Sequence, residues 1–345
     1  MNPTLPLSPA RAPTLSDVAR QAGVSHQTVS RVLNAPHSVA ELTRVRVLEA
    51  LRELDYHPNR AARSLVRGRS GLLGLISYSD PHYGPAQMRL AIEGAARAAG
   101  YGLGVASVPE LSVAEVGQAL EHLLEQGVEG VVLIMPLQIE FEALLPLLER
   151  VPCVLLGTTP KIPFAGAAID QHLGAVLATR HLLERGHRDI GYIGGPDSWS
   201  DAQARRKGFV DTLKGVGLQA AGLEGGDWTA AGGYAALHRL LERAPQCSAV
   251  LTANDQMALG ALRAARVRGL WVPEDLSLVG FDNLPESEYF EPPLTTVHQD
   301  FRTLGECGIG LLLAQLGGTA PPEPVTFCLE PALVVRSSTL ELNPM

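Results

Sequence analysis

Residues 26–31 carry side chains whose types and spacing suit DNA recognition. On a helix, at about 100° per residue, a polar arc of about 140° is formed by His26, Gln27, Ser30 and Arg31. Gln27 and Arg31 can form paired hydrogen bonds with purine edges in the major groove, and their neighbours can reach bases or phosphates. On an isolated helix, the same arc is more simply a solvated face. The surrounding elements decide between these interpretations.

The segment around the arc has the pattern of a helix, a tight turn and a second helix. Thr14 followed by Asp17 resembles an N-cap with an acidic partner. An apolar helical face follows, made of Leu15, Val18, Ala19 and Ala22. Gly23 is expected to end this helix, and Ser25 is placed to cap a second helix from His26 to about Leu33. The arc therefore lies on the second helix of a helix-turn-helix.

A third helix and a basic segment favour the DNA-binding interpretation. The third helix is expected to close a small bundle with an apolar face made of Leu42, Val45, Leu48, Leu51 and Leu54. Residues 1–69 carry ten arginines against five acidic residues, a net charge of +5, whereas the whole chain has −8 and residues 70–345 therefore −13. A basic head on an acidic body fits a head that approaches phosphates.

Bulk composition limits the class of protein. A chain of 345 residues with 46% apolar content suggests two or three globular domains. No long uncharged apolar stretch or signal peptide is evident, so we expect a cytoplasmic protein without a membrane segment. The four cysteines are far apart, and we interpret them as buried free thiols without a metal or other cofactor. Neither a nucleophile elbow nor a phosphate-binding loop occurs, so we expect no enzyme.

Residues 70–345 alternate short apolar runs with amphipathic helical stretches. The helices are expected near 86–99, 112–126, 139–149 and 173–185, and from about 201. This alternation occurs in two series, which predicts two α/β halves with parallel sheets and a cleft between them. Ligands of such sheets bind at the carboxyl ends of the strands. Polar residues collect at these ends, namely Asp197, Asn254, Asp255, Asp282 and Asn283.

Several motifs together resemble a known family. They are TLSDVARQAGVSHQTVSRVLN, LDYHPNRAARSL, EGGDWTA, TANDQMALGALRA and PPLTTVHQDFRTLG. From about Thr14 to Leu340, the chain resembles the lactose/galactose repressor family of LacI-type transcription regulators, its lactose-type members more than its purine-sensing ones. The resemblance implies a ligand-controlled, sequence-specific DNA-binding repressor, most simply one with a sugar or glycoside inducer. A corepressor-dependent metabolic repressor and a sugar-binding transport-type protein are the alternatives.

The resemblance also implies a domain organisation. Residues 1–13 would be a disordered tail, 14–58 an all-α helix-turn-helix domain, 59–69 a hinge helix and linker, and 70–345 a periplasmic-binding-protein-like core for effector binding and dimerisation. Within this core, one subdomain would span about 70–168 plus 299–324, and the other about 169–296 plus 326–340. The chain would cross between them three times.

The implied DNA contacts lie in the head and the hinge. His26, Gln27 and Arg31 would read bases, and Leu65 would be a minor-groove wedge that unstacks a base step and bends the duplex. The remaining expected DNA-binding residues are Thr14, Ser25, Thr28, Ser30, Asn34 and Asn59. The partners would be pseudo-palindromic double-stranded DNA and a second copy of the chain. A homodimer is expected because the tetramer-forming C-terminal helix of the lactose type has no counterpart here.

The implied ligand site lies in the core cleft. Arg205, Asn254 and Asp282 would bind sugar hydroxyls, while Trp228 would supply a flat apolar face. Gln299 and Phe301 would line the pocket near a crossover. Taken singly, Trp228 fits a core tryptophan equally well, and Asp282 fits a helix cap.

Four positions depart from the pattern of lactose-type members. Gly157 and Met135 replace a sugar-binding aspartate and an asparagine, which changes the expected ligand. His82, Tyr83 and Asp80 could compensate near the cleft mouth. Ala40 replaces a serine that caps the third helix, and His26 replaces a tyrosine of the base-reading helix.

Overall fold

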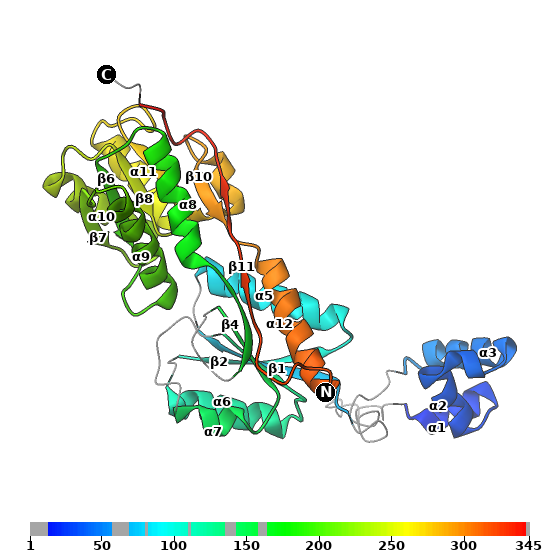
Figure 1. Ribbon diagram of the computed structural model, residues 1–345. Coiled ribbons are helices and arrows are strands. Elements are labelled where there is room, and N and C mark those ends of the chain that lie inside the picture. Colours follow the sequence, from blue (N-terminus) through cyan, green and yellow to red (C-terminus); the bar gives the residue numbers. More distant parts are fainter. Residues whose placement is uncertain are drawn as a thin grey trace, which may run out of the picture. The chain divides into compact units, whose positions relative to one another are not determined.

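The computed structural model describes residues 13–56, 69–79, 82–109, 112–134, 143–157 and 164–342. The chain forms two compact units, Met1–Ser70 and Gly71–Met345. Figure 1 shows the helices of the first unit in blue and the elements of the second from cyan to red. We call these units the head and the core. The predicted hinge residues Asn59 and Leu65, and also Asp80 and Met135, lie outside the described residues.

The head contains three α-helices, α1 (Leu15–Ala22), α2 (His26–Asn34) and α3 (Glu41–Glu53), with a short 3₁₀ turn at Pro36–Ser38. The predicted helix-turn-helix is confirmed, and the predicted caps explain its boundaries.

Local capping interactions fix the start of α1 and the turn between α1 and α2. The Thr14 backbone N–H donates to the Asp17 carboxylate at 2.9 Å, and the Asp17 N–H donates to the Thr14 hydroxyl at 3.3 Å. Gly23 ends α1 in the left-handed region at φ 61°, where a glycine has no steric penalty. The Ser25 hydroxyl then accepts a 3.2 Å hydrogen bond from the Thr28 N–H and begins α2. Short-range chemistry therefore sets where the recognition helix starts.

A small apolar core holds the three helices together. Val18, Val29 and Val47 come from α1, α2 and α3 respectively, and all three are fully buried. The Arg46 guanidinium on α3 also donates hydrogen bonds to the carbonyls of Ala22 and Gly23. These bonds satisfy carbonyls at the end of α1 that lack helical partners.

The predicted inner face of α3 is wrong over its first two turns. Leu42, Val45 and Leu48 are 81%, 42% and 41% exposed, whereas Val47 and Ala50 are buried. A strict spacing of three residues drifts around a helix, so positions twelve residues apart differ by about 120°. The buried face instead follows Val47, Ala50, Leu51 and Leu54. Three apolar side chains of α3 are therefore left on the surface.

The first half of the core is an all-parallel sheet with the strand order β11-β5-β4-β3-β1-β2. Its strands are β1 (Leu72–Tyr78), β2 (Gly102–Val108), β3 (Val131–Ile134), β4 (Cys153–Leu156), β5 (Ala165–Ile169) and β11 (Thr326–Leu329). Its helices are α5 (Tyr83–Ala98), α6 (Val113–Glu125), α7 (Leu145–Leu148) and α12 (Phe301–Leu316).

Helices cover both faces of this sheet. Val131 and Leu133 of β3 pack in one cluster with α6 and the α7 region, whereas Val132 and Ile134 pack in another with α5 and α12. Alternate residues of a strand point to opposite faces, so each strand contributes to both layers. This arrangement explains the continuous apolar runs in the sequence.

The second half repeats the plan with the strand order β12-β10-β9-β8-β6-β7. Its strands are β6 (Ile190–Gly194), β7 (Gly222–Gly225), β8 (Ala249–Thr252), β9 (Ser277–Asp282), β10 (Thr295–His298) and β12 (Ala332–Val334), of which β12 runs antiparallel to β10. Its helices are α8 (Gln171–Glu184), α9 (Ser200–Gly215), α10 (Ala230–Arg243) and α11 (Asp255–Val267), with a 3₁₀ helix η3 (Pro285–Tyr289).

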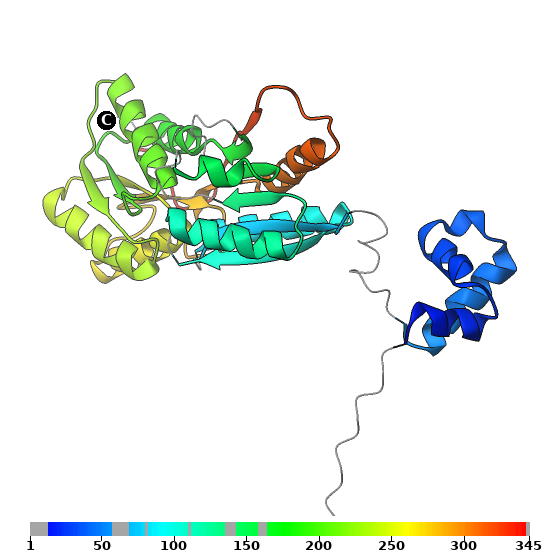
Figure 2. The same cartoon turned by 90° about the horizontal axis from the view of Figure 1, so that it is seen from below.

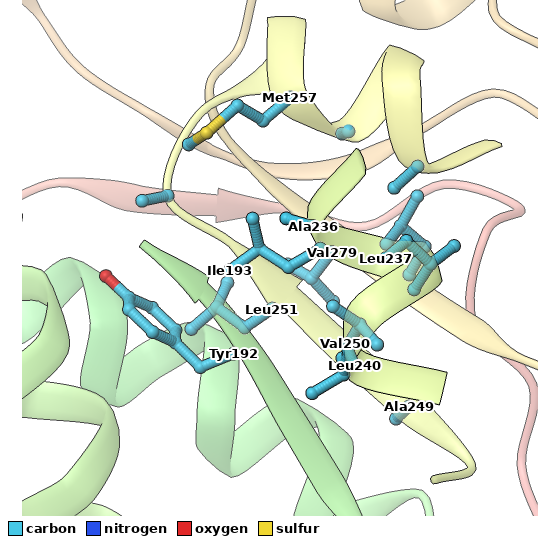
Figure 3. Packing of buried hydrophobic residues seen from close by; sticks show 14 of the residues in the cluster. Tyr192, Ile193, Ala236, Leu237, Leu240, Ala249, Val250, Leu251, Met257 and Val279 are labelled. Atoms are coloured by element: carbon cyan, nitrogen blue, oxygen red, sulfur yellow. The ribbon is translucent and has the colours of Figure 1, made fainter. Parts of the chain in front are cut away.

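A single large apolar cluster holds this second half. Figure 3 shows Ile193 and Leu251 of the sheet lying close to Leu237 and Leu240 of α10. On the opposite side of β6, the Tyr192 ring stacks on Phe209 of α9 with centroids 5.0 Å apart. The second half is therefore a rigid scaffold for the loops at its strand ends.

The chain crosses between the two halves three times. The crossings lie between β5 and α8, between β10 and α12, and between β11 and β12. Figure 1 shows the third crossing in red beside α12 and the two halves as separate lobes, which overlap in the view of Figure 2. Because no lobe is continuous in sequence, movement of one lobe must bend all three crossings together.

Two further sequence expectations were wrong in part. The described portion of the expected helix at 139–149 contains only Leu145–Leu148, because Pro146 lacks an N–H and fits only the first turn of a helix. Cys153 and Cys247 are buried, but Cys307 is half-buried and Cys328 is exposed. The exposure of Cys328 follows from its place on β11, the edge strand of the first sheet.

Candidate ligand pocket and DNA-reading face

The predicted polar arc lies on the outer side of α2. His26, Gln27 and Arg31 are exposed, while Val29 and Val32 on the opposite side are 0% and 5% exposed. Two apolar anchors therefore hold the helix and leave three side chains with donor or acceptor groups pointing outward. This arrangement suits a helix that enters the major groove.

The other predicted DNA-binding residues of the head have different surroundings. Thr14 and Ser25 are N-caps whose hydroxyls accept backbone hydrogen bonds, so they mark helix N-termini, which attract phosphates. Thr28 and Ser30 are partly buried on α2. The side chain of Asn34 lies outside the described part. Ala40 caps α3 without a side-chain hydrogen bond, as its residue type dictates.

In the core, one pocket brings the six predicted ligand-binding residues together. It is a cleft that opens to solvent, and about 550 Å³ of space between its walls and in its open mouth is not filled by protein atoms. Its walls come from both lobes and from the crossing before α12. The lining residues are His82, Tyr83, Gly84, Pro85, Met88, Gly157, Ile169, Gln171, Trp199, Asp201, Arg205, Trp228, Asn254, Asp282, Gln299, Phe301 and Leu304.

Arg205 of α9 is the buried cation of this pocket, with only 5% of its surface exposed. Its Nε donates to the Gln171 side-chain oxygen at 2.9 Å, and its Nη1 lies 3.5 Å from Asp282 Oδ1. The guanidinium also lies over the Phe281 ring, 3.8 Å from the centroid. Hydrogen bonding and charge pairing hold the edge of the guanidinium, and the Phe281 ring packs against its face. The group is therefore preorganised for a ligand.

A chain of hydrogen bonds connects this cation with two of the crossings. Gln299 Nε2 donates to Asp282 Oδ1 at 2.7 Å, and Gln171 Nε2 donates to Gln299 Oε1 at 2.7 Å. Gln171 begins α8 directly after the first crossing, and Gln299 lies in the second. Polar contacts in the pocket are thus joined to two of the segments that connect the lobes.

Trp228 forms an aromatic wall in an uncommon backbone conformation. The residue is 7% exposed and has φ 69°, a left-handed value rarely adopted by bulky residues. Asn254 Nδ2 donates to its carbonyl at 3.0 Å. Its ring occupies the space beside Gly195, where an added Cβ would lie 2.2 Å from a ring carbon. Gly195 is therefore required for this ring position.

Not all of the polar residues predicted at the strand ends line the pocket. Asp255 is fully buried beneath it, where its carboxylate accepts from the Thr296 hydroxyl at 2.6 Å and the Leu284 N–H at 2.8 Å. Asp197 is exposed, and Asn283 accepts a 2.8 Å hydrogen bond from Arg336. These three residues have structural or surface roles.

Burial changes the acidity of the carboxylates around the pocket. Burial raises the pKa of Asp282 to about 6, although the Arg205 charge opposes this shift. Burial also raises the pKa of Asp255 to about 8, and the neighbouring Asp282 charge adds to the effect. Asp282 has φ 106°, which adds backbone strain at the same place. Such strain and shifted acidity are typical of functional sites.

Among the polar and aromatic lining residues, sequence reasoning missed Gln171, Trp199 and Asp201. Trp199 and Asp201 lie directly after the loop that follows β6, and Gln171 follows β5. The rule that ligands bind beyond strand carboxyl ends would have found them if it had been extended to the first turn of the next helix. His82 and Tyr83, the expected compensating residues, do line the pocket, as does Gly157.

Within the ranges that the structure describes, no helix is long and apolar enough to cross a membrane. In the same ranges, no group of three or more histidine, cysteine, aspartate or glutamate side chains could hold a metal ion.

Comparison with known proteins finds similarity in both the head and the core. A model described as bacterial regulatory proteins, lacI family, matches residues 14–59, and one described as a periplasmic binding protein-like domain matches residues 179–339. The chain is 36% identical to the lactose operon repressor of Escherichia coli (strain K12), over 96% of this chain and 91% of the relative. It is also 36% identical to the transcriptional repressor PurR of Glaesserella parasuis serovar 5 (strain SH0165), over 96% and 99%.

Solved structures resemble the chain over nearly its full length. A lac repressor dimer bound to operator and the anti-inducer ONPF has a TM-score of 0.85 and 35% identity, and the match covers 96% of this chain and all (100%) of the other. A complex of the transcriptional regulator CelR with cellobiose has a TM-score of 0.70 and 34% identity, with 94% and 99% covered.

A helix-turn-helix head and a two-lobed core with a polar and aromatic pocket define a ligand-responsive transcription regulator. The chain belongs to the lacI family of bacterial regulatory proteins and is a DNA-binding transcriptional repressor under ligand control. Its curated relatives are transcriptional repressors and not enzymes.

Proposed function

We propose that a sugar or glycoside binds the core pocket and releases this repressor from its operator. The observation that carries the proposal is the arrangement of Trp228 beside Arg205 and Asp282. An indole face packs against the C–H face of a pyranose, while guanidinium and carboxylate groups bind its hydroxyls. Trp228 Nε1 is buried and has no hydrogen-bond partner in the described part of the chain, so a ligand oxygen would satisfy it.

Each predicted residue has a role in this proposal. Arg205, Asn254 and Asp282 bind hydroxyl groups at the deep end of the pocket, where all three are nearly fully buried. Phe301 and Gln299 contact the ligand beside the second crossing. Repression itself requires binding and no catalysis.

The coupling to DNA follows from the two-lobed architecture. Lining residues come from both lobes, so a ligand that binds one lobe arrangement better shifts the population toward it. The hydrogen-bonded chain from Asp282 through Gln299 to Gln171 extends the effect to two crossings. We expect the residues toward the head, with the hinge at 59–69, to respond to this shift.

On DNA, we propose that residues 14–58 form the reading domain and that the protein acts as a homodimer in the cytoplasm. One head reads a short half-site, and two heads related by symmetry read a pseudo-palindrome. His26, Gln27 and Arg31 read bases, and Asn59 and Leu65 add backbone and minor-groove contacts. The solved lac repressor that resembles the chain is a dimer on its operator, which supports this assembly.

One observation favours the alternative in which the ligand is a corepressor that strengthens operator binding. Identity to PurR equals identity to the lactose operon repressor, so overall similarity does not choose between a corepressor and an inducer. A sugar, however, offers several hydroxyl donors to the carboxylates of this pocket, whereas a purine base offers only one or a few N–H donors. The pocket therefore favours the inducer.

The class of ligand, and whether it weakens or strengthens operator binding, can be tested with the full-length protein. A melting-temperature screen against sugars, glycosides, purines and sugar phosphates finds ligands, because a molecule that binds only the native state raises the melting temperature. An operator is selected from random DNA, and its release is followed by fluorescence anisotropy. Stabilisation by a sugar together with operator release is expected. Stabilisation by purines alone, or tighter operator binding with the ligand, would contradict the proposal.

A further inference from the structure

Two residues at the start of α9, Trp199 and Asp201, line the pocket beside the residues already described. Trp199 is the N-cap of α9 and Asp201 lies in its first turn, and both line the pocket. The Trp199 ring packs edge-on against Trp228 with centroids 5.6 Å apart. From the other lobe, the His82 ring stacks on Trp199 at 6.0 Å. The position of Trp199 is therefore fixed from both lobes.

The two carboxylates that line the pocket differ in their partners. Asp282 accepts a hydrogen bond from Gln299 and lies near Arg205, so part of its hydrogen-bonding capacity is used within the protein. Asp201 has no hydrogen bond from any described residue; the Arg205 charge favours its ionised form, and the charges of Asp201 and Asp282 oppose each other. A carboxylate can accept several hydrogen bonds and can donate none when ionised. Asp201 is thus a strong acceptor without a donor.

Charge in the pocket also separates ligand classes. Arg205 is the one permanent cation among the described lining residues, and it lies 3.5 Å from Asp282. The second carboxylate, Asp201, leaves an excess of negative charge. Burial raises the pKa of Asp201 to about 6, and the Arg205 charge opposes this shift. Such a pocket repels phosphate and carboxylate groups and attracts hydroxyl donors.

We propose that Asp201 is a specificity-determining residue of this pocket. Its carboxylate accepts hydrogen bonds from hydroxyl groups of an uncharged sugar seated against Trp199 and Trp228, and its charge excludes phosphorylated and acidic sugars. The inference rests on the proposed function, because it assigns the class of sugar that the same site binds. The buried, unpartnered Nε1 of Trp228 is a second observation that points to a bound hydroxyl-rich molecule.

The test compares Asp201→Asn with Asp197→Asn in the full-length protein. Each variant removes one carboxylate, Asp201 from the first turn of α9 and Asp197 from the loop before it, but Asp197 is exposed and does not line the pocket. Isothermal titration calorimetry measures the affinity of each protein for glucose, galactose, cellobiose, lactose, glucose 6-phosphate and glucuronate. Melting temperature shows that each variant is folded, and Asp201→Ser repeats the test with a smaller side chain.

For the sugar that the unaltered protein binds best among the uncharged four, we expect Asp201→Asn to weaken binding by about tenfold or more. Asp197→Asn should change it less than about twofold. Glucose 6-phosphate should bind far more weakly than glucose, and this gap should narrow in Asp201→Asn. Equal sugar affinity in Asp201→Asn, or tighter binding of an acidic sugar by the unaltered protein, overturns the inference alone. Binding of no uncharged sugar overturns the inference and the proposed function together.

Discussion

The head and the core place functional side chains in opposite ways. In the head, His26, Gln27 and Arg31 are exposed on one short helix, and caps from the same segment fix that helix. In the core, Arg205 and Asp282 are each 5% exposed, and their partners are distant in sequence. A site that reads a partner from outside needs one rigid helix. A site that surrounds its ligand needs several segments brought together.

Charge follows the same division. The basic head faces a polyanion, and exposed arginines at its surface gain from the release of counterions. The acidic core encloses its only pocket cation among the described lining residues and balances it with carboxylates. Variants in the head should therefore alter DNA binding alone, and variants in the pocket should alter the ligand response alone.

The largest expected effect is that of Arg205→Ala. Removal of the buried cation leaves Asp282 without its charge partner and removes the forked donor for sugar hydroxyls. We expect loss of the response to the inducer while operator binding stays intact, which gives permanent repression. Anisotropy on the selected operator, with and without the sugar, checks this. Release at the same sugar concentration as the unaltered protein would place the ligand site elsewhere.

Arg31→Ala is the matching test in the head. Loss of a paired hydrogen bond to a base should weaken specific operator binding by about 1–3 kcal/mol per half-site. Sugar affinity should stay unchanged, because Arg31 belongs to the other compact unit. Titration of operator and of random DNA at the same salt concentration separates specific from general binding. A base-reading role is excluded if both DNAs lose the same affinity.

Gly195→Ala tests whether the position of the Trp228 ring is required for sugar binding. The added methyl group would lie 2.2 Å from the Trp228 ring, so the ring must move. Overpacking of this kind costs about 1–3 kcal/mol of stability, and displacement of the ring should lower sugar affinity by a similar amount. Tryptophan fluorescence and isothermal titration measure the two effects. As a control, Gly215→Ala lies on α9 with open space around the position and should change neither.

The smallest expected effect is a difference in stability between variants on the buried and the exposed face of α3. Val47→Ala removes buried methyl groups and should destabilise the head by about 1–2 kcal/mol. Leu42→Ala removes an 81% exposed side chain and should stay within about 0.5 kcal/mol. Thermal unfolding of the full-length variants, followed by hydrogen exchange in the head, checks the difference. Equal destabilisation would show that Leu42 packs against another surface.

Much of the candidate site could be predicted before any coordinates. The caps Thr14 and Ser25, the turn at Gly23 and the outward arc on α2 depend on neighbours within a few residues, so their pattern is visible in sequence. The lining residues that belong to sequence motifs, such as Trp228 and Asn254, were also predicted. The inner face of α3 was predicted incorrectly, because a strict spacing of three residues drifts around a helix and so leaves Leu42, Val45 and Leu48 outside the face that Val47 and Ala50 occupy.

The sequence by itself determined the class of the protein, the alternation of strands and helices, the start of the recognition helix and the polar residues of the ligand motifs. Each of these depends on residue type and short spacing. Only the tertiary structure decided that Asp201 and Trp199 line the pocket and that Asp255 and Asp197 do not. The physical reason is that burial and hydrogen-bond partners depend on crossings that join distant segments, as when Gln171 contacts Gln299.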